Sequence, residues 1–314
     1  MSKHIIPIVF SFDNNLVLPA CVCLYSLLIN ANRDTFYDIF ILHSQKIELE
    51  KEMLNKLTEY FKNCTIQYRV VDASFDNSYE VRGITTATYY RLLIPEVVPE
   101  YDKIIYSDVD VIFQSDLSKI YENTDLEGYY VAGVNSLSHL ISDHHEYYKH
   151  LEVDPHKTIY AGNIILNSKA LLQDNVIDDF REHALKQYRF QDMDVLNIVC
   201  AGKIKYLPPS FCVTTYFMNL MLNHKKELLQ IWTDKELQSA FKDGIIHYNG
   251  QKPWKGYCLN FDIWWEYYRK SPFFEQLKYF DFFSDKLNEL DKLTLWKRIK
   301  ILIRYFVFGK YKHS

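Results

Sequence analysis

The chain has 314 residues, of which 48% are hydrophobic and 24% are charged, and its formal net charge is −4. This composition is that of an ordinary globular protein with one large or two small domains, and the negative charge argues against a nucleic-acid-binding protein. The six cysteines form no CxxC pair, which disfavours a zinc ribbon or thioredoxin-type site and indicates buried, reduced thiols.

Strands and helices are predicted to alternate along the first third of the chain. Apolar runs rich in β-branched residues predict strands over 4–12, 37–44, 65–73, 103–113, 129–135 and 159–168. Helices are predicted over 20–32, 46–61, 85–98 and 191–200. In the second helix Leu49, Met53, Leu57 and Phe61 share one face, and Pro95 and Pro99 are expected to end the third. This order predicts an α/β fold with a single mixed, mostly parallel sheet flanked by helices, whose ligands bind beyond the carboxyl ends of the strands.

One continuous core is expected over 1–256, followed by a C-terminal helical region over 257–314. Neither GxGxxG nor GxxxxGK[ST] occurs, so a dinucleotide site of the Rossmann type and a P-loop are unsupported. The sequence shows no signal peptide, and the uncharged stretch over 14–32 contains a proline and is too short in its apolar part to span a bilayer. We therefore expect a cytoplasmic protein.

The last segment of the chain is basic and amphipathic. After Asp291 it has seven Lys or Arg residues and no acidic residue. At helical spacing an apolar stripe is surrounded by basic side chains; the stripe is Leu295, Ile299, Leu302 and Phe306, and the basic residues are Lys297, Arg298, Lys300 and Arg304. Such a helix suits the anionic inner surface of a membrane, which predicts peripheral association. The alternative is a terminal helix that docks its apolar stripe on the domain.

Two carboxylates interrupt the apolar stretch over 103–113. Asp108 and Asp110 are separated by Val109 alone, and burying two like charges is costly unless something positive pairs with them. On an extended segment, side chains at i and i+2 point to the same side, where two carboxylates form a site for Mg²⁺ or Mn²⁺. The alternative is a solvated loop end.

A distant segment offers groups that would complete such a site. In "HYNGQKPW", His247 can serve as a third metal ligand when its imidazole is neutral. Gly250 would let the backbone approach a phosphate, and Lys252 would neutralise phosphate charge. The alternative is that these are ordinary surface residues.

Two further acidic segments lie where a ligand could be held. Asp13 and Asn15 follow the first predicted strand, where a nucleotide base or ribose would be bound in a doubly wound sheet. Asp192 and Asp194 stand at the start of a predicted helix, and capping of that helix is the alternative explanation for them.

Taken together, these segments resemble the retaining glycosyltransferases of family 8, the group that contains lipopolysaccharide galactosyl- and glucosyltransferases and glycogenin. The resemblance covers roughly residues 5–256. It rests on "IVFSFDNN", "TTATYYRLLIPE", "IIYSDVDVIFQSDL", "YAGNIILN", "QDMDVLNIVCAGKIKYLP" and "HYNGQKPW", which occur in the order seen in the family.

The resemblance implies a GT-A fold, Mn²⁺ or Mg²⁺, and a UDP-hexose donor, UDP-glucose or UDP-galactose. It implies metal ligation by Asp108, Asp110 and His247, and a catalytic role for Asp192 and the two metal-binding aspartates. Donor-binding residues would be Asp13, Asn15, Arg91, Val109, Ala161, Gly162, Gly250 and Lys252. Among these, Asp13 and Asn15 would contact uridine, and Arg91 would lie near the sugar and phosphate.

The sequence departs from the family pattern beside the expected donor sugar. Tyr160 stands where the family often has Asn, and Met193 stands where it often has Gln, a candidate nucleophile in some members. The expected function is retaining hexosyl transfer to a glycan or lipid-linked saccharide, as in the synthesis of bacterial cell-surface polysaccharide or lipopolysaccharide. The alternatives are transfer to a protein, hydrolysis of a UDP-sugar, and non-catalytic UDP-sugar binding.

Overall fold

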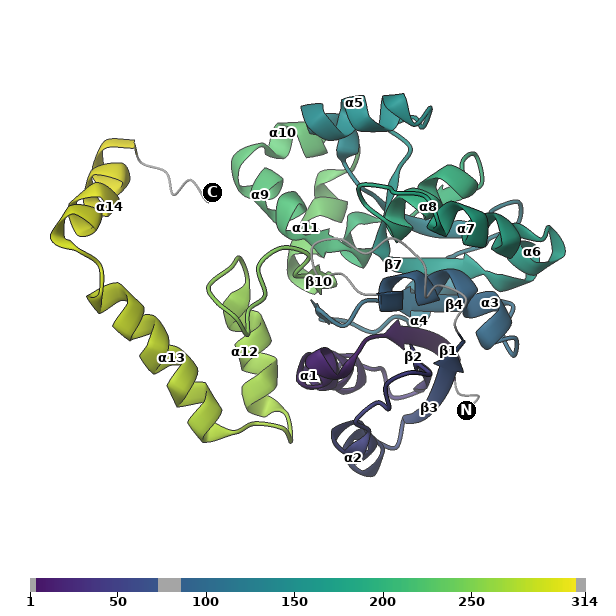
Figure 1. Ribbon diagram of the computed structural model, residues 1–314, viewed down its shortest axis with the longest axis horizontal. Helices are drawn as coiled ribbons and strands as arrows, with labels where there is room; N and C mark the ends of the chain where they lie inside the picture. Colours follow the sequence, from purple (N-terminus) through teal and green to yellow (C-terminus); the bar gives the residue numbers. More distant parts are fainter. Residues whose placement is uncertain (1–3, 73–85, 309–314) are drawn as a thin grey trace. The chain divides into compact units, whose positions relative to one another are not determined.

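The computed structural model describes residues 4–72 and 86–308, without the side chains of Thr86, Leu290, Asp291 and residues 304–308. Two ends of predicted elements, Ala73 and Thr85, lie outside this part. The chain divides into two compact units, Met1–Ser271 and Pro272–Ser314, which are taken separately here (Figure 1).

A seven-stranded sheet is the centre of the first unit. Its strands are β1 (His4–Ser11), β2 (Thr35–Ser44), β3 (Cys64–Val71), β4 (Lys103–Ser107), β6 (Val131–Asn135), β7 (Ile159–Asn167) and β8 (Ile204–Tyr206). Their order is β3-β2-β1-β4-β7-β6-β8. Strand β7 runs antiparallel to both of its neighbours, and the other pairs are parallel. The expected mixed, mostly parallel sheet is confirmed.

A second, three-stranded sheet was not predicted. It consists of β5 (Val111–Ile112), β10 (Ile246–His247) and β9 (Val213–Thr214), in that order. Each of these strands has two residues, which is too short for an alternating pattern to show in the sequence. The stretch predicted as one strand over 103–113 is therefore two strands in two sheets, with a turn between them.

Helices cover both faces of the large sheet (Figure 1). The α-helices of this unit are α1 (Val17–Ile29), α2 (Glu52–Tyr60), α3 (Ile94–Val97), α4 (Ser118–Asn123), α5 (Ser142–His150), α6 (Ser168–Gln173), α7 (Val176–Ala184), α8 (Asp192–Val199), α9 (Thr215–Asn223), α10 (Lys225–Leu228), α11 (Asp234–Asp243) and α12 (Phe261–Lys270). The 3₁₀ helices are η1 (Asn14–Leu16), η3 (Thr86–Leu93), η4 (Ser138–Leu140) and η5 (Pro209–Phe211).

The core on one face of the sheet is formed by alternate strand residues and the helices packed on them. Phe40 of β2 and Tyr106 of β4 belong to one buried cluster with Tyr89 of η3, Phe180 of α7 and Leu196 of α8. Successive strand residues point to opposite faces, so the intervening buried residues face the side on which Figure 1 shows α1 and α2.

Two predicted helices differ from those observed. The stretch over 85–98 is a 3₁₀ helix that continues into the short α3, and Pro95 lies in the first turn of α3, where proline is tolerated, rather than ending a helix. Helix α2 begins only at Glu52 and ends at Tyr60, so the predicted Leu49 and Phe61 lie outside it, and the residues it buries are Leu54 and Leu57.

The compact unit includes α12, which lies beyond residue 256. Nε1 of Trp265 donates to the carbonyl of Pro253 at 3.0 Å, and Nδ2 of Asn30 donates to the hydroxyl of Tyr267 at 2.8 Å. Trp264 is 1% exposed and stacks on Tyr268. These contacts hold α12 on the first unit.

The second unit contains α13 (Gln276–Asp291) and α14 (Leu295–Phe308). In α14, Leu295 and Trp296 are 74% and 80% exposed, and Leu302 is 52% exposed. The side chains of Arg304 and Phe306, which belong to the expected stripe and its basic surround, lie outside the description. Within residues 4–72 and 86–308, no helix combines the length and apolarity needed to cross a membrane.

Candidate active site

Asp108 and Asp110 lie on the turn that joins the two sheets. Strand β4 of the large sheet ends at Ser107, and β5 of the small sheet begins at Val111. The turn is held from both sides: the N–H of Asp108 donates to the carbonyl of Gly162 at 2.7 Å, and the N–H of Tyr248 donates to the carbonyl of Asp110 at 2.9 Å. The two carboxylates therefore converge because of this turn, not because they share one side of an extended strand.

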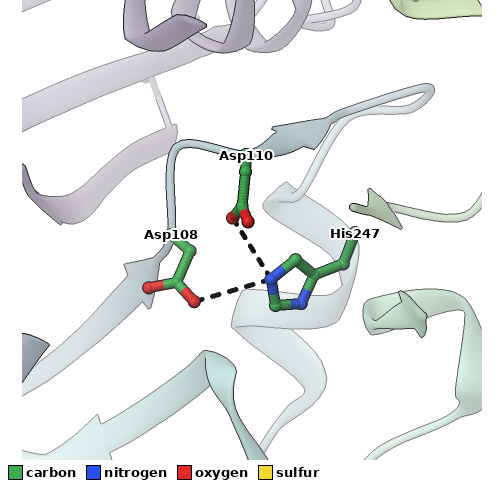
Figure 2. A group of neighbouring side chains, drawn as sticks. All are labelled: Asp108, Asp110 and His247. Atoms are coloured by element: carbon green, nitrogen blue, oxygen red, sulfur yellow. Dashed lines mark ion pairs between the residues drawn. The ribbon is translucent and has the colours of Figure 1, made fainter. Parts of the chain in front are cut away.

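His247 brings its imidazole to the same place, as Figure 2 shows. Nε2 of His247 lies 3.2 Å from Oδ1 of Asp110 and 3.6 Å from Oδ2 of Asp108. One ligand atom from each of the three residues lies within 4.8 Å of the other two, and no other such group of three occurs among the described residues. Two carboxylate oxygens and an imidazole nitrogen are a donor set that fits Mn²⁺ or Mg²⁺.

Positive groups balance the charge of Asp110. Burial by itself raises the pKa of Asp110, but His247 and Lys252 outweigh it and hold the pKa below its usual range. Nζ of Lys252 contacts Oδ2 of Asp110 and donates to the carbonyl of Tyr248 at 2.7 Å. Burial lowers the pKa of His247, but Asp110 reverses this and raises it to about 10. The sequence-predicted Lys252 is thus part of the same cluster.

Gly162 closes the cluster from the side of β7. A Cβ at this position would lie 2.3 Å from Cε1 of His247 and 2.7 Å from Oδ2 of Asp108, distances that real Cβ atoms do not tolerate. Only glycine lets the strand, the carboxylate and the imidazole approach this closely.

Arg91 lies between Asp108 and Asp192. Its Nη2 donates to Oδ1 of Asp108 at 2.8 Å, and its Nε lies 3.0 Å from Oδ2 of Asp192. Nη1 donates to the carbonyl of Ala161 at 2.7 Å, and Nε also donates to the carbonyl of Thr88. Arg91 therefore links the carboxylates of Asp108 and Asp192, and every nitrogen of its buried guanidinium has a partner in the protein.

Asp192 is buried beside this arginine. Its Oδ1 accepts from the hydroxyl of Thr88 at 2.9 Å. Burial raises the pKa of Asp192, Arg91 opposes the rise and Asp108 adds to it, and the pKa stands at about 6. Asp192 is therefore held next to the candidate metal site, with a pKa above the usual range of a carboxyl group.

Asp194 does not share this position. Its Oδ2 accepts from the hydroxyl of Tyr147 at 2.6 Å and from the N–H of Phe190 at 2.8 Å, which ties α5 to the start of α8. The residue between, Met193, is partly buried against the core. Of the two aspartates in this stretch, Asp192 thus belongs to the candidate site, whereas Asp194 connects two helices.

The remaining predicted donor-binding residues follow β1 and β10, lie on the turn after β4, or belong to β7. Oδ1 of Asp13 accepts from the N–H of Asn15 at 2.9 Å, just beyond the carboxyl end of β1, which is paired with β4. Val109 and Ala161 are buried. A Cβ on Gly250 would meet only Oγ1 of Thr215, at 4.0 Å, so its surroundings are open. The described contacts of Asp13 are local and do not join it to the three candidate ligands.

Several residues of the site were missed because they stand in stretches that predict core or turn. The hydroxyl of Tyr106 donates to Oδ1 of Asp108 at 2.8 Å. Sγ of Cys212 lies 3.6 Å from Nδ1 of His247. Alternation along β4 could have indicated Tyr106; no sequence signal marks Cys212.

Comparison with known proteins identifies the class. The protein-family model described as "Glycosyl transferase family 8" matches residues 7–258. General stress protein A of Bacillus subtilis (strain 168) is 26% identical over 261 residues, which cover 80% of this chain and 88% of that protein. Glycosyltransferase GlyF of Streptococcus pneumoniae serotype 4 is 25% identical over 268 residues; the match covers 83% of this chain, but only 60% of GlyF.

Solved structures show the same fold. An active-site mutant of LgtC superposes with a TM-score of 0.69 at 19% identity, over 86% of this chain and 98% of LgtC. The apo structure of the bifunctional glycosyltransferase WbbM gives a TM-score of 0.70 at 23% identity and covers 88% of this chain, which spans about half (51%) of WbbM. The architecture is the GT-A fold of these glycosyltransferases, as the resemblance to family 8 implied. The chain belongs to glycosyltransferase family 8.

Proposed function

We propose that the protein transfers glucose or galactose from a UDP-hexose to a glycan or lipid-linked saccharide, with retention at the anomeric carbon and with Mn²⁺ or Mg²⁺. The observation that carries this proposal is the convergence of Asp108, Asp110 and His247 at the carboxyl edge of the sheet. In open α/β sheets this edge is where nucleotide ligands bind. One of the solved relatives is the galactosyltransferase LgtC in complex with donor and acceptor sugar analogs.

Different residues around the cluster would bind different parts of the donor. Asp108, Asp110 and His247 would hold the metal ion, which supplies positive charge to the diphosphate when bound. Asp13 and Asn15 would contact uridine at the end of β1. Val109, Ala161 and Gly162 would offer backbone near the donor, and Gly250 and Lys252 would contact the diphosphate. Arg91 would act near the sugar through the two carboxylates that it holds.

Lys252 would assist the departure of UDP. Its ammonium group already lies in the cluster, on Asp110, so a short movement of a flexible side chain would bring it to a diphosphate oxygen. A cation there stabilises the charge that develops on the leaving group, and UDP then needs no strong general acid.

Asp192 would hold the donor sugar. Its position, fixed by Thr88 and Arg91, lets it accept hydrogen bonds from sugar hydroxyls while ionised. Retention would follow from front-face attack, in which the departing phosphate oxygen takes the proton of the acceptor hydroxyl. A covalent intermediate on Asp192 is the alternative route to retention. Met193 offers no amide oxygen for such a role.

We assign this chemistry to residues 1–256 and membrane association to residues 257–314. The exposed Leu295 and Trp296 and the basic residues of α14 support binding to an anionic surface. Peripheral binding at the cytoplasmic face would bring the protein to the membrane that carries a lipid-linked acceptor for a bacterial cell-surface polysaccharide or lipopolysaccharide.

A non-catalytic protein that binds UDP-sugars is the second candidate. Tyr160 and Met193 favour it, since both replace residues that contact the sugar in much of the family. Oγ1 of Thr214 lies 3.3 Å from the hydroxyl of Tyr160, which ties this side chain to the small sheet beside His247. Transfer to a protein acceptor and hydrolysis of a UDP-sugar use the same donor site.

The experiment that tests the proposal has two stages. A thermal-shift panel of UDP-sugars, each with and without Mn²⁺, identifies the donor by the largest stabilisation. The release of UDP is then followed with that donor, Mn²⁺ and a series of glycan acceptors. Transfer that stops in EDTA supports the proposal; binding without release of UDP under all conditions supports the second candidate. Turnover that persists in EDTA would contradict the role of the metal.

A further inference from the structure

The second nitrogen of the His247 ring has a partner of its own. Nε2 faces the two aspartates, whereas Nδ1 lies 3.6 Å from Sγ of Cys212. Cys212 is 0% exposed and His247 is 6% exposed, so water has little access to this contact. The imidazole is thus held between carboxylates at one nitrogen and a thiol at the other.

The backbone keeps the thiol at the ring. Cys212 directly precedes β9, and β9 is parallel to β10 with His247 opposite Thr214. The N–H of Val213 donates to the carbonyl of Ile245 at 2.8 Å, which fixes the two chain segments next to each other. Because Gly162 closes on the same ring, the imidazole has little room to turn.

A histidine can bind a metal only through a nitrogen with a free lone pair, and the other ring nitrogen then carries the proton. We propose that Cys212 is a positioning residue for His247: its Sγ accepts the Nδ1–H, and this contact turns Nε2 toward Asp108 and Asp110, where a bound metal ion would take the place of the Nε2 proton. The consequence for metal binding rests on the proposed function. The contact between thiol and imidazole does not depend on it.

The competing explanation is that Cys212 is only a small apolar side chain in a core. Cys200 is such a residue, because it is 0% exposed and belongs to the buried cluster on the large sheet. Sulfur is a weak acceptor compared with the carboxylate or carbonyl that often orients a metal-binding histidine. We therefore expect an effect on metal affinity of about tenfold, at the lower end for such partners.

The test compares the full-length protein with Cys212→Ala, Cys212→Ser and the control Cys200→Ala. The Mn²⁺ dissociation constant is measured by electron paramagnetic resonance of the free ion. The ring ¹⁵N and N–H signals of His247 are recorded without metal and with Mg²⁺. We expect Cys212→Ala to weaken Mn²⁺ binding by about tenfold and to shift the Nδ1 signal. Cys212→Ser retains a hydrogen-bond acceptor, so its Mn²⁺ affinity and its Nδ1 signal should be close to those of the unmodified protein. Cys200→Ala should change neither the Mn²⁺ affinity nor the Nδ1 signal, although it should lose about as much thermal stability as Cys212→Ala.

The outcomes separate this inference from the proposed function. Equal Mn²⁺ affinity and an unchanged Nδ1 signal in Cys212→Ala would overturn the positioning role. If the unmodified protein bound neither Mn²⁺ nor Mg²⁺, the metal role of the proposed function would fail. The Nδ1 signal of the metal-free variants would then decide whether Cys212 orients the ring: a shift in Cys212→Ala that Cys212→Ser reverses supports it, and no shift refutes it.

Discussion

The backbone of Gly162 lies so close to the ring of His247 that a Cβ on Gly162 would be 2.3 Å from Cε1. This proximity joins β7 of the large sheet to β10 of the small sheet at the point where the two aspartates lie. A single methyl group placed there would enter the space that the imidazole and the carboxylate of Asp108 share.

We expect Gly162→Ala to weaken Mn²⁺ binding by about tenfold or more, because His247 and Asp108 would have to move apart. The affinity is measured by calorimetry. Gly256→Ala is the matched control, since nothing lies within 4 Å of a Cβ at that position. Tight Mn²⁺ binding by Gly162→Ala would show that the three candidate ligands do not act together.

Loss of the imidazole should remove metal-dependent turnover. We expect His247→Ala to lower kcat/KM by about 100-fold or more, because two carboxylates alone bind a divalent ion weakly. His150→Ala, in the exposed last turn of α5, serves as the control and should leave the rate unchanged. A His247→Ala protein with normal Mn²⁺-dependent rates would refute the assignment.

The pKa of Asp192, raised by burial to about 6, predicts the acidic side of the pH profile. In its proposed role the carboxylate accepts hydrogen bonds from sugar hydroxyls when ionised, that is, above this pH. As the pH falls through about 6 the group gains a proton, and kcat/KM should drop by about tenfold for each further unit. Steady-state rates between pH 4.5 and 8 would check this. Asp192→Asn should be slow at every pH, and its rate should not fall further below pH 6. If the rate of Asp192→Asn still fell with the same midpoint, the titration would belong to another group.

Tyr147 is expected to matter for stability and not for metal binding. Its hydroxyl donates to Asp194 and accepts the N–H of Arg189 at 2.9 Å. Removing the hydroxyl in Tyr147→Phe leaves a buried carboxylate with one fewer donor, at a cost of about 1–3 kcal/mol in the free energy of unfolding. Urea denaturation measures the loss, and Mn²⁺ affinity measured on the folded variant should equal that of the unmodified protein. Unchanged stability would mean that Asp194 is satisfied without Tyr147.

The basic residues of α14 are expected to bind anionic lipid. Each contributes about 1 kcal/mol near such a surface, so replacing Lys297, Arg298 and Lys300 together by Glu should lower binding by about 100-fold or more. Co-sedimentation with anionic and neutral vesicles measures this. Lys235→Glu combined with Lys242→Glu, on α11, is the control. Equal binding of both variants to anionic vesicles would favour a tail that docks on protein.

The outline of the site followed from local chemistry in the sequence. Asp108 and Asp110 were evident because two carboxylates in an apolar stretch need a positive partner. Lys252 and His247 were singled out by residue type, and the resemblance to family 8 assigned them to the same site. The contacts of Arg91 were not evident: the structure places it between Asp108 and Asp192, and its position near the donor stays a prediction. Its buried contacts involve η3, β4, β7 and α8, whose meeting no short stretch of sequence encodes.

The sequence by itself indicated six of the seven strands of the large sheet, the helices α1, α2 and α8, and the side chains able to hold a divalent ion, because hydrophobic period and ligand chemistry are local properties. Only the tertiary structure decided how these side chains meet. The small sheet of β5, β9 and β10 consists of strands too short to leave a pattern in the sequence. Yet the pairing of β5 with β10 places His247 opposite Val111, next to the turn that carries Asp108 and Asp110. The same pairing places Cys212 against the imidazole, a contact set by the distance between two backbones and not by any motif.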